Sequence, residues 1–160
     1  MHYGELRNYL QLKELSILRG EDNMLKRTVV FALSIDENQK QALEKTIQLY
    51  SKAYLYCIDI AWDMQLSKVK VHKATYRKLK KKLGLKSQYL CSSRNRAIET
   101  IKSLRALKSK GKKVSKPTSK RIPIRLDART FSFDKLRENV SITTQKRRIS
   151  IPLVWHKQAM

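Results

Sequence analysis

Apolar side chains recur at alternating steps of four and three residues between residues 43 and 64. The positions that share this spacing are Leu43, Ile47, Tyr50, Tyr54, Cys57, Ala61 and Met64. Such steps place side chains on one face of an α-helix, so the pattern predicts a long amphipathic helix. Ser34 and Glu37 precede it with the spacing of a capping box, which would satisfy two backbone N–H groups at the helix start.

Two further helices are predicted before residue 110. Residues 66–71 indicate a loop or hinge, and residues 72–83 are helical in composition up to Gly84, which suits a left-handed helix end. Ser87 can cap the third helix. The predicted buried stripe of that helix comprises Leu90, Ala97, Ile101 and Leu104. Arg94 falls within this stripe, where it either lies along the apolar face with its head group in water or is held rigidly for one phosphate.

Patterns of period two lie on both sides of the helices. Residues 27–33 read RTVVFAL, which is β-branched and apolar and predicts a strand. The alternating positions after residue 117 are Ile122 and Ile124, Phe131 and Phe133, Val140 and Ile142, and Ile149, Ile151 and Leu153. They predict three or four short strands with a turn at residues 145–147, and a short helix is expected around residues 7–18.

The order of strand, three helices and further strands predicts an α+β protein. If the N-terminal strand pairs with the C-terminal ones, the helices between them form an insertion. We therefore expect an N-terminal extension at residues 1–24 and a β domain made of residues 25–34 and 118–160. Residues 35–117 are expected to form an inserted basic helical unit.

Charge is distributed unevenly along the 160 residues. The chain has 36 Lys and Arg against 13 Asp and Glu, a net charge of +23. Residues 66–122 hold 20 basic and 1 acidic side chain, whereas residues 1–65 hold 8 and 9. Such crowding destabilises a compact chain unless an outside partner compensates it. We expect one continuous cationic surface that binds a polyphosphate backbone, because released counterions favour such binding.

Acidic lipid is the competing partner for this charge. Helices that bind membrane surfaces carry Trp, Phe or Leu opposite their cations, and residues 66–122 contain Tyr76 and Tyr89 but no Trp or Phe. No apolar run approaches the roughly 20 residues of a membrane span, and no signal peptide is recognisable. The sequence favours a soluble, cytoplasmic chain that binds RNA or DNA and no membrane.

Patterns for catalysis and metal binding are sparse. Cys57, Cys91 and the three histidines are too far apart for a zinc site. Asp59 and Asp63, at positions i and i+4, either face one metal ion or form ion pairs with nearby cations. Trp62 between them either packs in the core or offers a platform for a base. We expect no enzymatic activity and no cofactor in this chain.

The candidate binding residues are cations of the second and third helices and the loop after them. They are Lys78, Lys81, Lys82, Arg94, Arg96, Arg105, Lys112, Lys113 and Lys116. Distributed cations of this kind favour contacts to backbone phosphates over reading of base edges. Tyr76 and Tyr89 either stack on unpaired bases or pack between helices.

Several segments also resemble a known family in their order. These segments are VVFAL, IDENQ, KAYLYCIDIAW, LGLKSQ, KGKKVSKP, LDARTFSFD and VSITTQKRRISIPL. Over residues 25–153 their order is similar to the N-terminal part of the TnpB (OrfB) proteins of insertion sequences, which are related to compact type V CRISPR nucleases. Arg147 stands at a turn where that family often has Gly. A residue other than Gly is strained at positive φ, so a tight turn is in doubt at this position.

The resemblance implies a small β-barrel-like wedge platform with an inserted three-helix recognition lobe. Together they would hold a guide RNA and its hybrid with target DNA through A-form geometry. It adds Arg121, Arg125 and Arg129, on the wedge strands, to the candidate binding residues. TnpB proteins continue into a RuvC-like nuclease domain, which needs Mg, and a four-cysteine zinc unit. Neither is expected in this chain, so Mg and Zn would come only with a separate catalytic half.

Three functions follow from the residues and the resemblance together. The first is a nucleic-acid-binding module of an RNA-guided nuclease, without catalysis of its own. The second is one subunit of a split nuclease that works with a separate RuvC-like chain. The third is a free-standing DNA-binding regulator derived from a transposase.

Overall fold

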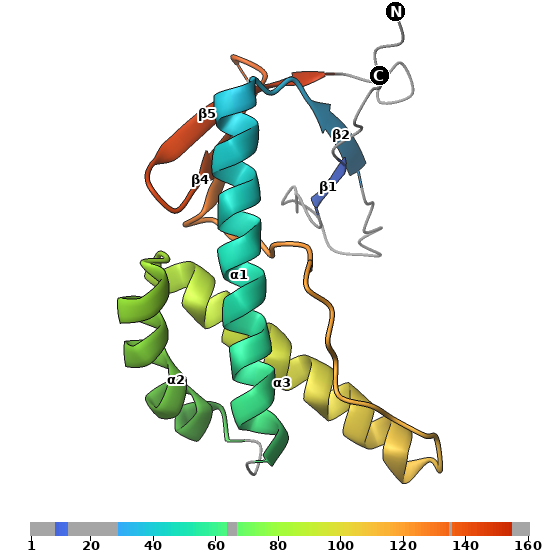
Figure 1. Cartoon of the computed structure of the whole chain (residues 1–160). Coiled ribbons are helices and arrows are strands. Elements are labelled where there is room, and N and C mark those ends of the chain that lie inside the picture. Colours follow the sequence, from blue (N-terminus) through green and yellow to red (C-terminus); the bar gives the residue numbers. More distant parts are fainter. Residues whose placement is uncertain (1–8, 13–28, 64–66, 135, 155–160) are drawn as a thin grey trace, which may run out of the picture.

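The computed structural model describes residues 9–12, 29–63, 67–134 and 136–154. Within these ranges, three helices and five strands make an α+β protein, as the sequence predicts (Figure 1). The strands are β1 (Tyr9–Leu12), β2 (Val29–Leu33), β3 (Phe131–Asp134), β4 (Asn139–Thr143) and β5 (Arg148–Val154). The helices are α1 (Glu37–Asp63), α2 (Lys68–Leu83) and α3 (Ser87–Ser109). Among the described helices, none combines the length and hydrophobicity that a membrane span requires.

The strands form one antiparallel sheet in the order β1-β2-β5-β4-β3. β2 pairs with the end of β5, where Ala32 lies opposite Val154 and Leu33 opposite Leu153. The predicted pairing of the N-terminal strand with the C-terminal strands is therefore confirmed. β1 and β3 are the two edges of this order, so the described strands make an open sheet.

The register of β3, β4 and β5 places their alternating apolar residues on one face. Ile142 of β4, for example, lies between its partners Phe131 and Ile149. The buried residues of this sheet core are Val140, Ile142, Ile149, Ile151 and Leu153. The predicted period of two is thus confirmed for these three strands.

A turn after Thr143 joins β4 to β5, as predicted. The backbone N–H of Thr144 donates to the carbonyl oxygen of Arg147 at 2.8 Å. Among the described residues other than glycine, Glu138 alone has a positive φ, at 50°. Arg147 therefore turns the chain without the left-handed conformation that a glycine would have favoured.

The expected helix around residues 7–18 is wrong where the structure describes that range. Residues Tyr9–Leu12 form β1 and pair with β2, with Tyr9 opposite Ala32 and Leu12 opposite Val29. A short helix is marginal by itself, whereas the edge of β2 offers a ready ladder of backbone hydrogen bonds. Residues 7–8 and 13–18 lie outside the described residues.

The strand expected at Ile122 and Ile124 is also wrong. Residues 118–126 run as an extended segment along the helices instead of joining the sheet (Figure 1). Ile122 is buried in the helical core, and its N–H donates to Ser51 Oγ of α1 at 3.1 Å. Side chains of the helices thus satisfy the backbone groups that a neighbouring strand would otherwise have bound.

A capping box begins α1, two residues later than predicted. The N–H of Gln39 donates to Asp36 Oδ1 at 2.7 Å, and the N–H of Asp36 donates to Gln39 Oε1 at 3.2 Å. The N–H of Ser34 donates to the carbonyl oxygen of Pro152 at 3.2 Å, which extends the pairing of β2 with β5. The predicted cap at Ser34 and Glu37 is wrong, because the backbone of Ser34 is still bonded to β5 and Glu37 is already the first residue of α1.

The boundaries of α2 and α3 differ from prediction by a few residues. α2 starts at Lys68 after the cap residue Ser67, so the expected loop at 66–71 is shorter, and Gly84 ends α2 with the predicted left-handed conformation, φ 59°. Ser87 does not cap α3, because it is the first helical residue. Its Oγ instead accepts a hydrogen bond from Tyr76 Oη at 2.9 Å.

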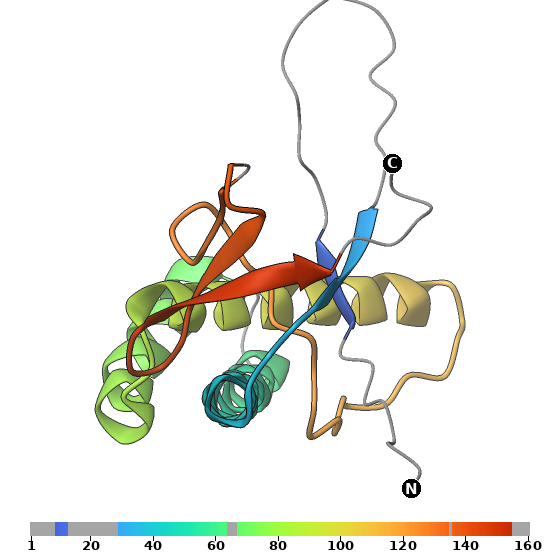
Figure 2. The same ribbon diagram turned by 90° about the horizontal axis from the view of Figure 1, so that it is seen from above.

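α1 connects two hydrophobic cores. Its first turns place Leu43 against the sheet core, and its later turns contribute to a helical core shared with α2 and α3. The predicted apolar face of α1 is buried there at Tyr50, Tyr54, Cys57 and Ala61. Met64 lies outside the described residues. Figure 2, which looks along α1, shows β5 and α3 on the same side of this helix, as one continuous apolar stripe requires.

Candidate nucleic-acid interface

Lysines near the end of α2 form one group of candidate binding residues. This α2 cluster comprises Lys78, Lys81 and Lys82, which are all exposed. The Nζ of Lys78 lies 5.4 Å from the ring centre of Tyr56 on α1, a cation–π contact. Lys80, in the same run, donates to Ser87 Oγ at 3.3 Å and braces the turn from α2 to α3. Within the described part of the chain, no acidic side chain pairs with the α2 cluster.

A second group of cations surrounds the end of α3. This loop cluster comprises Arg105, Lys108, Lys112 and Lys113, which are exposed and line a cavity of about 430 Å³. Trp62 of α1 lines the same cavity. Lys108 is absent from the residues predicted to bind. The sequence does contain a signal for Lys108 as a binding residue. It follows Leu104 by one helical turn and begins the basic run KSKGKK.

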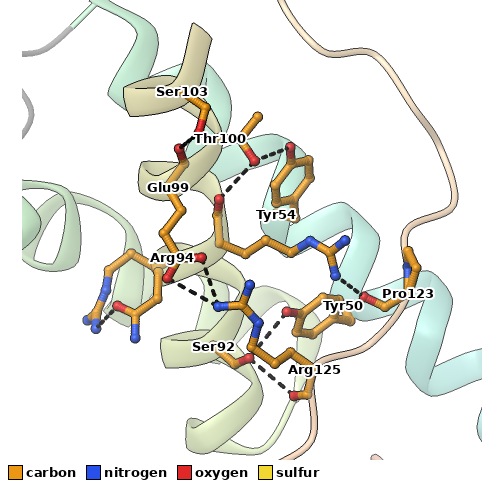
Figure 3. Close-up of polar contacts among 11 residues, drawn as sticks. Tyr50, Tyr54, Ser92, Arg94, Glu99, Thr100, Ser103, Pro123 and Arg125 are labelled. Carbon is orange, nitrogen blue, oxygen red and sulfur yellow. Dashed lines mark hydrogen bonds and ion pairs between the residues drawn. The ribbon is translucent and has the colours of Figure 1, made fainter. Parts of the chain in front are cut away.

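Arginines near the middle of α3 bind within the protein (Figure 3). Arg125, on the extended segment, forms an ion pair with Glu99 of α3 at 2.8 Å. Its carbonyl oxygen accepts a hydrogen bond from Ser92 Oγ at 3.2 Å. Arg96 donates to the carbonyl oxygen of Pro123 on the same segment. These contacts fasten residues 118–126 to α3, so Arg96 and Arg125 have a structural role. Their binding of phosphate stays a prediction.

Two more of the predicted cations have protein partners. The Nζ of Lys116 lies 2.8 Å from Asp59 Oδ1 of α1, which favours the ion-pair interpretation of Asp59 over the metal-ligand one. The side chain of Asp63 lies outside the described residues. Arg129 donates to Gln88 Oε1 at 3.4 Å. Arg121 is exposed on the extended segment.

The head group of Arg94 is buried rather than extended to water, so that interpretation is wrong. Only 8% of the residue is exposed. One terminal nitrogen donates to Asn95 Oδ1 at 2.9 Å, and the other contacts His72 Nδ1. Burial and the charge of Arg94 both lower the pKa of His72, so a neutral imidazole can accept this bond. The rigid placement for one phosphate stays a prediction.

The α2 cluster and the loop cluster lie at opposite ends of α3 (Figure 1). α2 ends where α3 begins, and the loop follows the last residue of α3. A helix of 23 residues is about 34 Å long at about 1.5 Å per residue. The two clusters are therefore separated by most of the length of α3, where Arg94 and Arg96 have partners within the protein and Lys102 is exposed. That they belong to one continuous cationic surface stays a prediction.

The aromatic candidates differ in accessibility. Tyr89 is fully buried, its ring meets that of Tyr50 edge to face at 6.3 Å, and its hydroxyl donates to the carbonyl oxygen of Thr143. Stacking of Tyr89 on a base is therefore wrong. Tyr76 is half-buried and its ring lies 4.8 Å from that of His72. Trp62 packs partly against the helical core and also lines the cavity, so both interpretations of this residue stay open.

Reactive side chains are few among the described residues. Burial raises the pKa of the Cys57 thiol to about 11 and so keeps the thiol protonated. Thr75 and Arg94 lower this pKa, but by less than burial raises it. Burial by itself would raise the pKa of Asp127, but hydrogen bonds from Thr130 and others outweigh it and leave the pKa lowered. No three His, Cys, Asp or Glu side chains lie close enough to hold a metal ion in the described ranges.

More than half of the chain matches one known protein family. Residues 46–143, from α1 to the end of β4, match the family described as uncharacterized protein MJ0013 family. The chain belongs to the MJ0013 family. Its matched range includes most of the helical core and both cationic clusters of this chain. No curated protein and no solved structure matches the chain.

Proposed function

We propose that the chain is the nucleic-acid-binding part of a TnpB-like, transposon-associated RNA-guided nuclease in the cytoplasm. It holds guide RNA, or the hybrid of RNA and DNA, through backbone phosphates and performs no chemistry by itself. The observation that carries this proposal is the exposure of six lysines in the two clusters without an acidic partner among the described residues. Uncompensated cations of this kind release counterions from nucleic acid when they bind it.

The spacing of the clusters suits one extended polyanion. The phosphates of a duplex follow one another closely along its axis, about every 1.7 Å when both strands of DNA are counted. A duplex that follows α3 therefore presents phosphates to the α2 cluster and to the loop cluster, whatever the length of its helical turn. Lysine is a flexible point charge, which suits the phosphate backbone better than the edges of bases.

The remaining parts of the chain have supporting tasks in this proposal. In this proposal the sheet serves as a barrel-like wedge platform, and residues 35–117 serve as the recognition lobe. Arg121 and Arg129 extend the phosphate contacts from the helices toward the sheet. A RuvC-like domain or a separate RuvC-like chain supplies the catalytic centre with its Mg and the zinc unit.

Competition between polyanions tests the proposal. The ligands are an RNA duplex, an RNA–DNA hybrid and a DNA duplex of one sequence, and vesicles that contain phosphatidylserine. We expect the RNA duplex and the hybrid to bind at least about tenfold more tightly than the other two, as measured by fluorescence anisotropy and vesicle sedimentation. Preference for DNA of one sequence would instead favour the transposase-derived regulator, and binding to vesicles alone would contradict both functions.

A further inference from the structure

The cavity beside the loop cluster combines an apolar lining with a cationic rim. It lies between the end of α1, the second half of α3 and residues 112–114, and its volume is about 430 Å³. The apolar lining residues are Trp62, Ile101, Leu104 and Val114. Pockets that bind small molecules enclose about 300–1,000 Å³. The cavity can therefore admit a flat group of the size of one nucleobase.

Backbone hydrogen bonds fix the loop beside this cavity. The N–H of Gly111 donates to the carbonyl oxygen of Lys108 at 2.9 Å, and the N–H of Lys112 donates to that of Leu107 at 3.1 Å. This is the Schellman pattern of a helix end, and Gly111 has the positive φ that it requires, 76°. The chain reverses there, which brings Lys112 and Lys113 to line the same cavity as Trp62.

A second contact joins the two helices at the wall of the cavity. Arg105 Nη2 of α3 donates to the carbonyl oxygen of Trp62 at 3.4 Å. Trp62 also packs in part against the helical core, so its backbone and its ring are both supported. The backbone that carries the rim lysines and the ring of Trp62 are therefore held in place before any ligand arrives.

The charge at the cavity exceeds what the helix end needs. Cations near a helix C-terminus stabilise the helix dipole, which accounts for one or two of them. Here the three lysines Lys108, Lys112 and Lys113 line a cavity whose other described lining residues include no acidic side chain. An occupant that fits this lining joins negative charge to a flat apolar group. A nucleotide has both.

We propose that this cavity binds one unstacked nucleotide, with its base against Trp62 and its phosphates at the loop cluster. The inference rests on the proposed binding of nucleic acid and adds to it a preference for an unpaired position. Bases inside a duplex are stacked and cannot enter, whereas a bulged base can. Stacking on an aromatic ring tolerates any base, so the cavity recognises an unpaired nucleotide rather than a sequence.

The test compares two RNA ligands, a blunt RNA duplex and the same duplex with one bulged nucleotide. Trp155→Phe leaves Trp62 as the single tryptophan, so its fluorescence reports the cavity. We expect the bulged RNA to bind about 5- to 100-fold more tightly than the blunt one, and to quench Trp62. Trp62→Leu should remove most of this difference between the two RNAs. Trp62→Phe, which keeps a ring for stacking, is the matched control and should keep most of the difference.

Each outcome decides between the two proposals. If both RNAs bind with equal affinity and Trp62 fluorescence stays constant, the nucleotide site is wrong while nucleic-acid binding stands. If neither RNA binds, nucleic-acid binding fails and the nucleotide site fails with it. If Trp62→Leu does not fold, as judged by circular dichroism, the site is still tested by the quenching of Trp62 and by the affinities of Trp62→Phe for the two RNAs.

Discussion

The two ends of α3 carry similar charge in different surroundings. At the first end, the α2 cluster lies on an exposed helix surface beside Tyr56. At the other end, the loop cluster surrounds a cavity that Trp62 and other apolar residues line. Exposed charge alone can only attract a polyanion. Under the two proposals, both ends of α3 attract a polyanion, and only the end with the cavity also captures an unpaired nucleotide.

The middle of α3 differs from both ends in the kind of cation it uses. Arg94, Arg96 and Arg125 all donate hydrogen bonds to other groups of the protein there. The guanidinium group has several donors in a fixed plane, which suits such contacts, whereas the ends of α3 expose mainly lysines. A count of charges does not distinguish cations that are bonded within the protein from cations that are exposed to solvent. The partners of each head group do distinguish them.

The largest predicted effect comes from removing charge at one end at a time. The variants are Lys108, Lys112 and Lys113 changed to Gln, and Lys78, Lys81 and Lys82 changed to Gln. Each triple variant should weaken binding of a blunt RNA duplex by roughly tenfold or more, because each removes up to three phosphate contacts. For RNA with a bulged nucleotide, the loop variant should lose more affinity than the α2 variant. Fluorescence anisotropy measures all four combinations.

Two results would contradict these separate roles for the two ends of α3. Loss of binding in only one triple variant would mean that the duplex touches a single end of α3. If both variants lost the same affinity for both ligands, the cavity would contribute nothing to binding beyond the charge of its lysines. Thermal unfolding of each variant is the control, because exposed lysines contribute little to stability.

A smaller effect is predicted from the contact that fixes α2 against α3. Arg94 donates to His72 only while the imidazole is neutral, and the pKa of His72 is lowered from its ordinary value of 6.5 by burial and by Arg94. The unfolded chain therefore binds a proton more readily than the folded one, so stability falls as pH drops below about 6.5. His72→Gln keeps an acceptor and should remove this part of the loss.

Urea unfolding at pH 7.5 and at pH 5 measures this effect. The difference in unfolding free energy between the two pH values should be larger for the native chain than for His72→Gln. An equal difference for both proteins would mean that the contact between Arg94 and His72 does not depend on the charge of the imidazole.

The sequence predicts the regular elements better than the connections between them. The step of three and four from Leu43 to Ala61 and the alternation from Val140 to Leu153 each arise from burial of one face, so they reveal helix and strand directly. Gly84 is similarly informative, because its left-handed conformation is needed where α2 ends. Ile122 alternates like a strand residue yet lies against helices, since burial of every second residue does not specify which element covers it.

The candidate site shows the same limit. Local charge identifies the lysine run of α2 and the loop after α3, but their separation follows from the direction and length of α3. The cavity joins Trp62 to Lys112 and Val114, about 50 positions away, through the crossing of α1 and α3. The burial of Arg94 depends on His72 from another helix. No spacing along the chain encodes such contacts between distant residues.

The dependence of affinity on salt measures how many phosphates the protein contacts. If the six lysines of the two clusters contact phosphates, the affinity for an RNA duplex should fall by roughly 1,000-fold between about 50 and 200 mM salt. Removal of either lysine triple should make this dependence less steep. An affinity that changes by less than about threefold over that range would contradict binding through backbone phosphates.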